Sequence, residues 1–354
     1  MRACYQFMNA AAPGLNPVSF DDRELFDFSP SAARAKFLDD RMRSRLADSL
    51  GHVFEQTRDA FSLPSAQLEV FLSQLRNHPI SPLAFSYYCD LVIAIEQDDL
   101  TEARQLIQDL ILLPPHSGGP EVVDLGDPQT DLHGERYARF LNADLDVNFE
   151  IFPPSDSASQ SCRQQIRDAF ALMDVADPEL ATEIRALLRE IVLAAGTENP
   201  TAMTFDGASA FMLWGGIIIN ANRRDGALGM AQMLAHESAH NLLFGICTDE
   251  PLLLNPPEER YPSPLRIDLR PLEGIYHATF VSARMFRVVK NLLAHGQLMP
   301  EVAAKARKDL ADNARYFSQG FATVRQHGKL TELGEIILSN AADYMKANGG
   351  LIAA

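Results

Sequence analysis

The centre of the chain, residues 225–246, reads DGALGMAQMLAHESAHNLLFGI and contains the motif H-E-x-x-H at His236, Glu237 and His240. Apolar residues flank the motif on both sides, which predicts a helix buried in a core. Histidines at positions i and i+4 project from one face of a helix, so both imidazoles can reach a single metal ion. Glu237 lies beside them, where a carboxylate can handle a proton or orient a water molecule. The motif predicts a metal centre, and the alternative is a pair of core histidines bonded to backbone carbonyls.

A catalytic metal needs a third protein ligand, because two histidines rarely hold it alone. No histidine occurs between His240 and His277, so the metal-binding motif in which a third histidine follows closely is absent. Glu273 and His277 are the remaining candidates, one turn apart on a later predicted helix. We favour His277, because it lies among apolar residues where an unpaired imidazole is costly. Glu273 is the second choice and would match the third ligand of thermolysin-like peptidases.

Composition restricts the class of protein and its partners. The chain has 354 residues, of which 47% are hydrophobic and 22% charged, as in ordinary globular proteins. No apolar run reaches the roughly 18 residues of a membrane span, and the first residues lack a signal-peptide core, so we expect a cytoplasmic protein without a membrane partner. The four cysteines form no CxxC motif, which fits reduced thiols. A net charge of −16 argues against a nucleic-acid partner.

Periodicity predicts a mainly helical α+β protein. Residues 1–30 show little periodicity, and the segments that follow repeat apolar residues at helical spacing over 29–56, 65–77, 82–97 and 99–113. The proline- and glycine-rich run at 114–120 is the expected boundary between a helical N-terminal region, residues 1–118, and a metal-dependent catalytic domain, residues 119–354.

The second half is expected to hold a small sheet and two metal-bearing helices. Strands are predicted at 143–153 and in 208–221, where the latter is either an edge strand that adds a substrate peptide or an ordinary central strand. A long proline-rich loop at 248–271 is expected to cover the metal. Helices are predicted from about 160, from about 178, over 271–296 and twice within 300–347.

Two separated blocks carry a family resemblance. HESAH at 236–240 and SPLRIDLRPLEGIYHATFVSARM at 263–285 resemble the HExxH-motif enzymes that modify ribosomally made peptides. The resemblance covers roughly the C-terminal half of the chain. It implies a non-haem iron(II)- and 2-oxoglutarate-dependent hydroxylase that uses O2 and acts on the β-carbon of a residue in a precursor peptide. It also implies that His236, His240 and His277 hold the metal, with Arg270 and Pro271 preceding the third histidine.

The role of the neighbouring charged residues stays open at this point. A 2-oxo diacid needs a cation for its distal carboxylate, and Arg266, Arg270 and Arg284 are near enough in sequence to supply it, although each is as readily a structural or surface ion pair. The common oxygenase triad has a carboxylate where this chain has a third histidine, so the role of Glu237 stays open; an oxygenase would use it to orient a ligand or a water molecule. The alternatives are a zinc metallopeptidase with Glu237 as general base, and a metal-stabilised peptide-binding protein without turnover.

Overall fold

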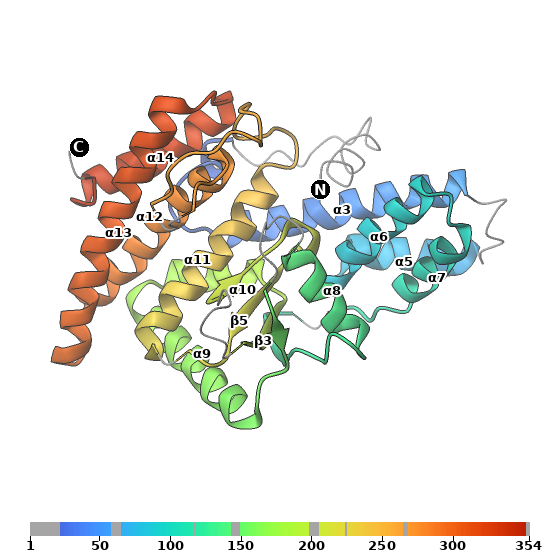
Figure 1. The fold of residues 1–354 in the computed structure, drawn as a ribbon, viewed down its shortest axis with the longest axis horizontal. Coiled ribbons are helices and arrows are strands. Elements are labelled where there is room, and N and C mark those ends of the chain that lie inside the picture. The colour runs from blue at the N-terminus through green and yellow to red at the C-terminus, as the bar shows by residue number, and fades with distance from the viewer. Residues whose placement is uncertain are drawn as a thin grey trace. The chain divides into compact units, whose positions relative to one another are not determined.

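The computed structural model describes residues 22–57, 65–116, 118–142, 149–197, 205–223, 225–264 and 268–351. Over these residues the chain is mainly helical and has a five-stranded mixed sheet, which confirms the expected mainly helical α+β class (Figure 1). No helix in this part of the chain has both the length and the apolar character that a bilayer crossing requires.

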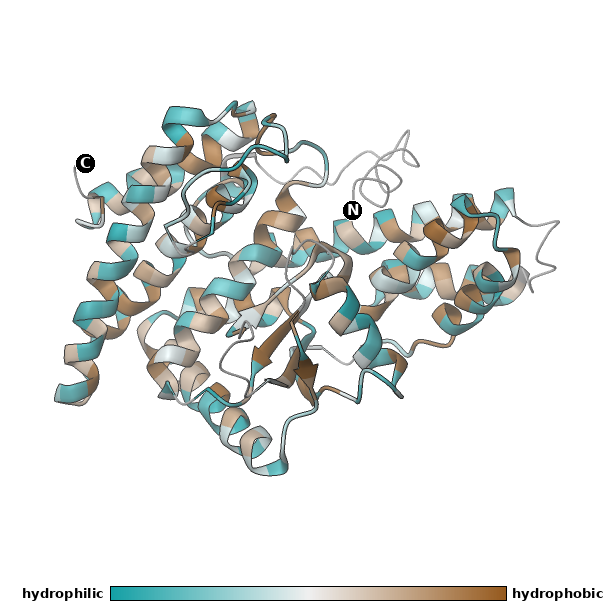
Figure 2. Ribbon diagram, in the orientation of Figure 1, coloured by the Kyte–Doolittle hydropathy of each residue, from teal (hydrophilic) through white to brown (hydrophobic). Residues whose placement is uncertain are grey.

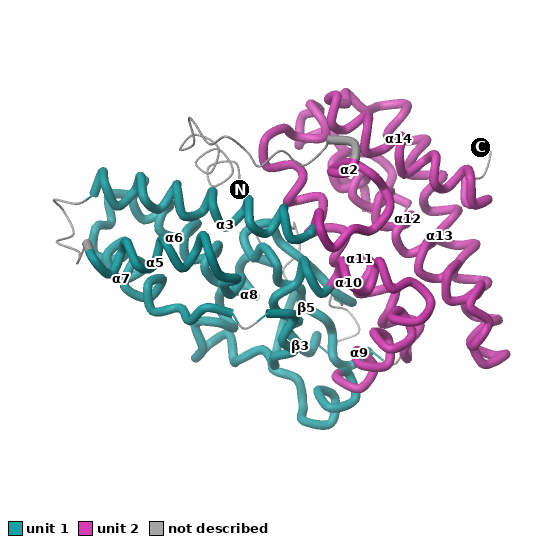
Figure 3. The backbone as a smooth tube through the Cα atoms, turned by 180° about the vertical axis from the view of Figure 1, so that it is seen from behind, with its two compact units in different colours: residues 1–19, 35–162, 185–223 teal, residues 20–34, 163–184, 224–354 magenta. Residues whose placement is uncertain are grey.

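The chain divides into two compact units, shown in different colours in Figure 3. Unit 1 includes residues 35–162 and 185–223, and unit 2 includes residues 20–34, 163–184 and 224–354. This division differs from the expected boundary between residues 118 and 119, which lies inside unit 1. The reason is that the strand following this point pairs with a later strand of the same unit, so the helices before residue 118 and the sheet after it belong together.

Unit 1 combines helices with the sheet. Its helices are α3 (Ala32–Gln56, whose first residues belong to unit 2), α5 (Ser65–Asn77), α6 (Leu83–Glu96), α7 (Leu100–Ile111) and α8 (Leu132–Leu141). Helices α3 and α5 to α7 confirm the four predicted helical segments. Helices α7 and α8 each begin with a capping carboxylate. The side chain of Asp99 accepts a hydrogen bond from the backbone amide of Glu102, and that of Asp131 accepts one from the backbone amide of His133.

The sheet has the order β1-β3-β5-β4, with β2 paired to β3. The strands are β1 (Glu121–Asp124), β2 (Ile151–Phe152), β3 (Glu190–Gly196), β4 (Gly207–Ala208) and β5 (Gly216–Asn220). Strands β1, β3 and β5 are parallel, with Glu190 opposite Gly216, whereas β2 and β4 pair in the antiparallel sense. Figure 2 shows that β3 and β5 are strongly hydrophobic, as expected for strands buried on both faces.

The observed strands differ from the predicted ones in three respects. The strand expected at 143–153 is confirmed only at Ile151–Phe152, and residues 143–148 lie outside the described residues. Strand β5 is an interior strand between β3 and β4, so it does not offer the open edge considered for peptide addition. Strands β1 and β3 were not predicted, because a short continuous apolar run such as that of β3 has no periodicity that separates strand from helix.

A buried carboxylate at the start of β3 ties three elements of unit 1 together. Glu190 accepts hydrogen bonds from the Ser81 hydroxyl and, at 2.9 Å, from the Tyr137 hydroxyl, and His133 Nε2 lies 3.6 Å from it. Burial alone would raise the pKa of Glu190, but the interactions with His133, Ser81 and Tyr137 outweigh it and lower the pKa below its ordinary value. The ionised carboxylate therefore stabilises the fold at neutral pH.

Unit 2 holds most of the remaining helices. These are α2 (Asp22–Leu25), α9 (Asp156–Ala176), α10 (Pro178–Leu187), α11 (Gly226–Ile246), α12 (Leu272–His295), α13 (Pro300–His327) and α14 (Glu332–Ala347), with α9 beginning and α10 ending in unit 1. They confirm the helices predicted in the second half of the chain. Helix α12 follows Pro271 and ends at Gly296, whose φ of 77° is the left-handed conformation typical of a glycine that stops a helix.

Helix α12 packs between α11 and α13 in unit 2. A side chain at Gly320 of α13 would place its Cβ 2.2 Å from Thr279 Oγ1 of α12, so the close approach of these helices depends on this glycine. The segment between α11 and α12 contains no helix among its described residues, as predicted. It is held by backbone bridges between Leu253 and Leu330 and between Tyr261 and Arg270.

Candidate metal centre

Helix α11 places the two histidines of the motif side by side. His236 Nε2 lies 3.2 Å from His240 Nε2, and the ring centroids are 4.9 Å apart. The helix is held rigidly because most of its residues are buried, including Leu234, Ala239 and Leu243. Both imidazoles are only half-buried, so this short polar patch remains reachable on an otherwise apolar helix.

Helix α12 brings the third histidine to the same place. His277 Nδ1 lies 3.1 Å from His240 Nδ1, and the two rings stack with centroids 5.3 Å apart and 18° between their planes. Phe244, one turn after His240 on α11, covers both rings with centroid distances of 6.3 Å to His240 and 5.5 Å to His277. The three imidazoles therefore lie together as a row in which His240 is the middle member.

The row differs from a finished three-nitrogen site in one respect. His240 faces His236 with Nε2 and His277 with Nδ1, whereas one ion takes one nitrogen from each ring. For this reason the described residues contain no group of three His, Cys, Asp or Glu donors that converge on one point. The His236–His240 pair fits a metal, because two Nε2 atoms each about 2.1 Å from an ion and separated by the observed distance subtend about 100° there, between octahedral and tetrahedral angles.

The protonation states suit metal binding. Burial, followed by the proximity of the His236 and His277 rings, lowers the pKa of His240 well below its ordinary value. Burial lowers the pKa of His277 to about 4. Both rings are consequently neutral at pH 7, the form in which an imidazole has a lone pair for a metal.

The two carboxylates considered in the sequence occupy different positions. Glu237 is buried, and its Oε1 lies 4.0 Å from His236 Nε2, so it is beside the imidazole pair. Glu273, the second choice for the third ligand, is exposed in the first turn of α12. Of the two candidates for the third metal ligand, His277 is the one that lies against a histidine of the motif, His240.

The three candidate arginines have different surroundings. Arg284 is fully buried, donates to Glu183 Oε1 and, at 2.9 Å, to the backbone oxygen of Phe28, and is therefore committed to a structural ion pair. Arg270 is partly exposed, with Nη1 3.1 Å from Asp268 Oδ2. Arg266 lies outside the described residues.

The contact of Phe244 with both rings was not anticipated as part of the site. Its spacing of four residues from His240 was the available indication, because residues i and i+4 meet on one helix face. The partner of Arg284 had no such indication, since Glu183 is far away in sequence.

The chain matches no protein-family model, and a comparison with curated proteins finds no match.

Proposed function

We propose that this chain is a metal-dependent enzyme whose metal is bound by His236, His240 and His277. The observation that carries the proposal is the unbroken row of three half-buried imidazoles contributed by two packed helices. The His236–His240 pair already has ligand spacing. His277 Nδ1 now faces His240 Nδ1 at 3.1 Å, so binding of one ion by all three residues requires the His277 ring to reorient toward the His236–His240 pair.

We further propose that the metal is iron(II) and that the reaction is 2-oxoglutarate-dependent hydroxylation of a peptide. The resemblance of the HESAH and SPLRIDLRPLEGIYHATFVSARM segments to HExxH-motif peptide-modifying enzymes supports this choice. Three imidazole ligands would fill only part of the coordination sphere of an iron ion, so a 2-oxo acid and dioxygen could also bind to it. The bound iron would supply the oxidation in which O2 gives one oxygen to the β-carbon of the peptide residue and the other to succinate, while 2-oxoglutarate loses CO2.

The chain's own residues then have separate tasks. His236, His240 and His277 would hold the ion as neutral ligands, and Phe244 limits the movement of two of these rings by stacking on His240 and packing at a tilt against His277. Glu237, buried beside His236 Nε2, orients that ligand or a water molecule next to it. Of the two described candidate arginines, we assign Arg270 to the distal carboxylate of 2-oxoglutarate, because its ion pair with Asp268 is partly exposed whereas the pair of Arg284 with Glu183 is buried.

A zinc peptidase is the second candidate, and the position of Glu237 favours it. A carboxylate 4.0 Å from a metal-ligating nitrogen is close enough to take a proton from a water molecule on the metal. The two reactions differ in products: the hydroxylase releases succinate and adds one oxygen to the peptide, whereas the peptidase cleaves it. A metal-stabilised peptide-binding protein would do neither.

Metal content is the first test. The protein is loaded anaerobically with iron(II), and separately with zinc, and the bound metal is measured by mass spectrometry of the elements after gel filtration. His277→Ala should lose most of the metal, since two imidazoles rarely hold it. Glu273→Ala, at the rejected ligand position, and His52→Ala, an exposed histidine on α3, should retain it. Full metal content in His277→Ala, with loss in Glu273→Ala, would favour the peptidase arrangement.

The second test measures the reaction. A candidate precursor peptide is incubated with the iron-loaded protein, 2-oxoglutarate and O2, and peptide mass and succinate are followed together. A mass gain of one oxygen with an equal amount of succinate is expected. Arg270→Lys retains the charge but loses the planar fork, so it should raise the KM for 2-oxoglutarate by about tenfold or more, the loss of one charge-assisted hydrogen bond. Peptide cleavage without 2-oxoglutarate contradicts the hydroxylase proposal.

A further inference from the structure

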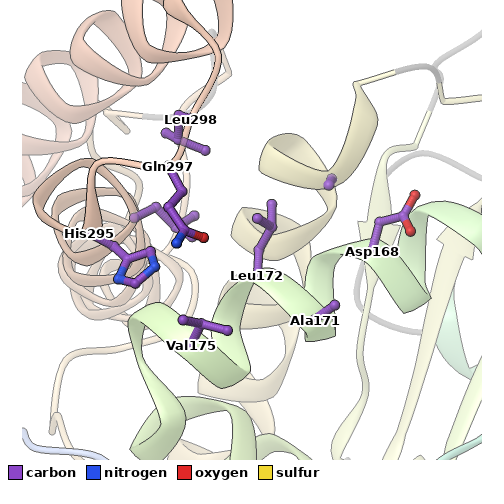
Figure 4. A pocket seen from close by; sticks show the side chains of 9 residues that line it. Asp168, Ala171, Leu172, Val175, His295, Gln297 and Leu298 are labelled. Carbon is purple, nitrogen blue, oxygen red and sulfur yellow. The ribbon is translucent and has the colours of Figure 1, made fainter.

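Two neighbouring cavities lie in unit 2, where α11 begins. Their volumes are about 350 and 410 Å3, and both are lined by Leu172, Ala227, Gln297 and Leu298, so they adjoin. Their walls come from α9, from the start of α11, and from the end of α12 with the start of α13. We call this pair of cavities the α9–α13 groove, and Figure 4 shows the first of them from close by.

Apolar side chains exposed to solvent line both parts of the groove. On α9, Asp168, Ala171, Leu172 and Val175 follow helical spacing and present one face to the first cavity. Val175 is 57% exposed, and Met299, which lines the second cavity, is 67% exposed. In Figure 4, Leu172 lies across from Gln297, on the opposite wall. Each cavity therefore offers a place for an apolar side chain of a partner.

The charge along the groove is acidic in both parts. Asp168 lines the first cavity together with the imidazole of His295, and Asp225 and Glu301 line the second. The lysine that lines the second cavity, Lys305, has its ammonium 2.7 Å from Asp309 Oδ2, which neutralises it locally. A partner that complements the groove carries cationic groups beside apolar groups. Because carboxylates and exposed apolar side chains occur in each of the two adjoining cavities, an elongated partner can contact both.

The groove and the imidazoles lie on the same helix of unit 2. Ala227 lines both cavities and His236 follows nine residues later on α11, which at about 1.5 Å per residue is a separation of about 14 Å. An extended peptide advances at most about 3.5 Å per residue, so it needs at least about four residues to connect the two places. A docked segment and a reacting residue on one peptide are thus compatible with both sites.

We propose that the α9–α13 groove docks a segment of the peptide substrate that carries apolar and basic side chains. This segment is separated from the modified residue by at least about four positions. The inference rests on the proposed function in naming the substrate peptide as occupant. The groove itself is defined by residues that take no part in the metal centre.

Docking is tested by binding alone, with the full chain and without metal or 2-oxoglutarate. The probes are two fluorescein-labelled peptides of about twelve residues, one alternating leucine with lysine and one alternating leucine with glutamate. Fluorescence anisotropy measures their binding. The leucine–lysine peptide should bind saturably and the leucine–glutamate peptide at least about tenfold more weakly, because only the former complements the carboxylates. Raising the NaCl concentration from about 50 to about 500 mM should weaken binding of the leucine–lysine peptide, because salt screens charges on the protein surface.

Variants locate the binding. Val175→Lys places a cation on an exposed position of the groove and should weaken leucine–lysine binding about fivefold or more. Glu301→Gln, in the first turn of α13, should weaken it about two- to fivefold, the range for an exposed charge pair. The matched control is Glu332→Gln, an exposed first-turn glutamate of α14 outside the groove, which should leave binding unchanged.

Four results would overturn the proposal. Equal affinity for the two peptides removes the charge argument, and wild-type affinity in both Val175→Lys and Glu301→Gln places binding elsewhere. A change of oligomeric state in Val175→Lys, seen by light scattering, assigns the groove to a second copy of the chain. Failure of the proposed function is separate: a peptide that docks through the groove but is never hydroxylated refutes the reaction and leaves docking intact. Hydroxylation that proceeds normally in variants without docking refutes the groove alone.

Discussion

Replacing Glu183 by Gln removes a carboxylate that two buried arginines share in unit 2. Glu183, on α10, accepts from Arg34 Nη2 at 2.6 Å, from the backbone amide of Ser31 at 2.7 Å, and from Arg284 Nη2. The side chains of Arg34 and Arg284 are 0% and 1% exposed, and that of Glu183 is 2% exposed. Burial lowers the pKa of Arg34 to about 10, so its guanidinium is still charged at neutral pH.

The expected loss of stability is large because the substitution leaves the guanidiniums buried. Gln retains the shape of Glu, but it has no charge, and one of its two terminal atoms becomes a donor that faces another donor. Removing one partner of a buried ion pair lowers the free energy of unfolding by about 3 to 5 kcal/mol. At about 2 to 4 °C per kcal/mol for a unit of this size, the midpoint of thermal unfolding should fall by about 6 to 20 °C.

Urea unfolding followed by far-ultraviolet circular dichroism measures the effect, with wild type and variant at the same pH and ionic strength. The matched control is Glu179→Gln on the same helix, where an exposed carboxylate lies 3.1 Å from Arg287. An exposed pair contributes about 1 kcal/mol at most, so this variant should unfold nearly as the wild type does. A loss below about 1 kcal/mol in Glu183→Gln would show that the buried carboxylate is not what holds the two arginines.

Three further outcomes are expected. Glu190 has a lowered pKa in the folded chain, so its contribution to stability is present above about pH 4.5 and is lost as pH falls through the folded pKa; urea unfolding of Glu190→Gln should show a flatter pH dependence between about pH 5 and 3, and an unchanged slope would contradict this. Gly320→Ala should destabilise by about 1 to 3 kcal/mol although alanine is the better helix former, because the new Cβ would lie 2.2 Å from Thr279 Oγ1. Gly274→Ala, where the nearest atom is 3.9 Å away, should instead be neutral or stabilising in the same thermal melts, and equal signs for the two would refute the packing argument. Arg284→Lys should lower the unfolding midpoint and leave the affinity for 2-oxoglutarate, measured by anaerobic calorimetry, unchanged; the opposite pattern would return Arg284 to the cosubstrate site.

Local chemistry was enough to predict most of the helices, including the two that carry the candidate metal ligands, α11 and α12. The Pro271 start and the Gly296 stop of α12 depend on the backbone properties of single residues, so they are readable in the sequence. The same holds for His236 and His240, because four-residue spacing on a helix brings two side chains to one face whatever surrounds them. The preference for His277 over Glu273 followed from its apolar neighbours, and His277 lies against His240 while Glu273 is exposed.

Tertiary structure decided what depends on residues far apart in the chain. From the sequence, Arg284 was a candidate both for binding a cosubstrate and for an ordinary ion pair. Only folding brings it to Glu183, about a hundred residues away in the chain. Strand β3 becomes recognisable through its partners β1 and β5, since its short apolar run is equally compatible with a buried helix. The ring nitrogens that His240 turns toward its two neighbours also depend on how α11 and α12 pack. A sequence specifies that imidazoles share a helix face, whereas the packing of two helices determines which of their atoms meet.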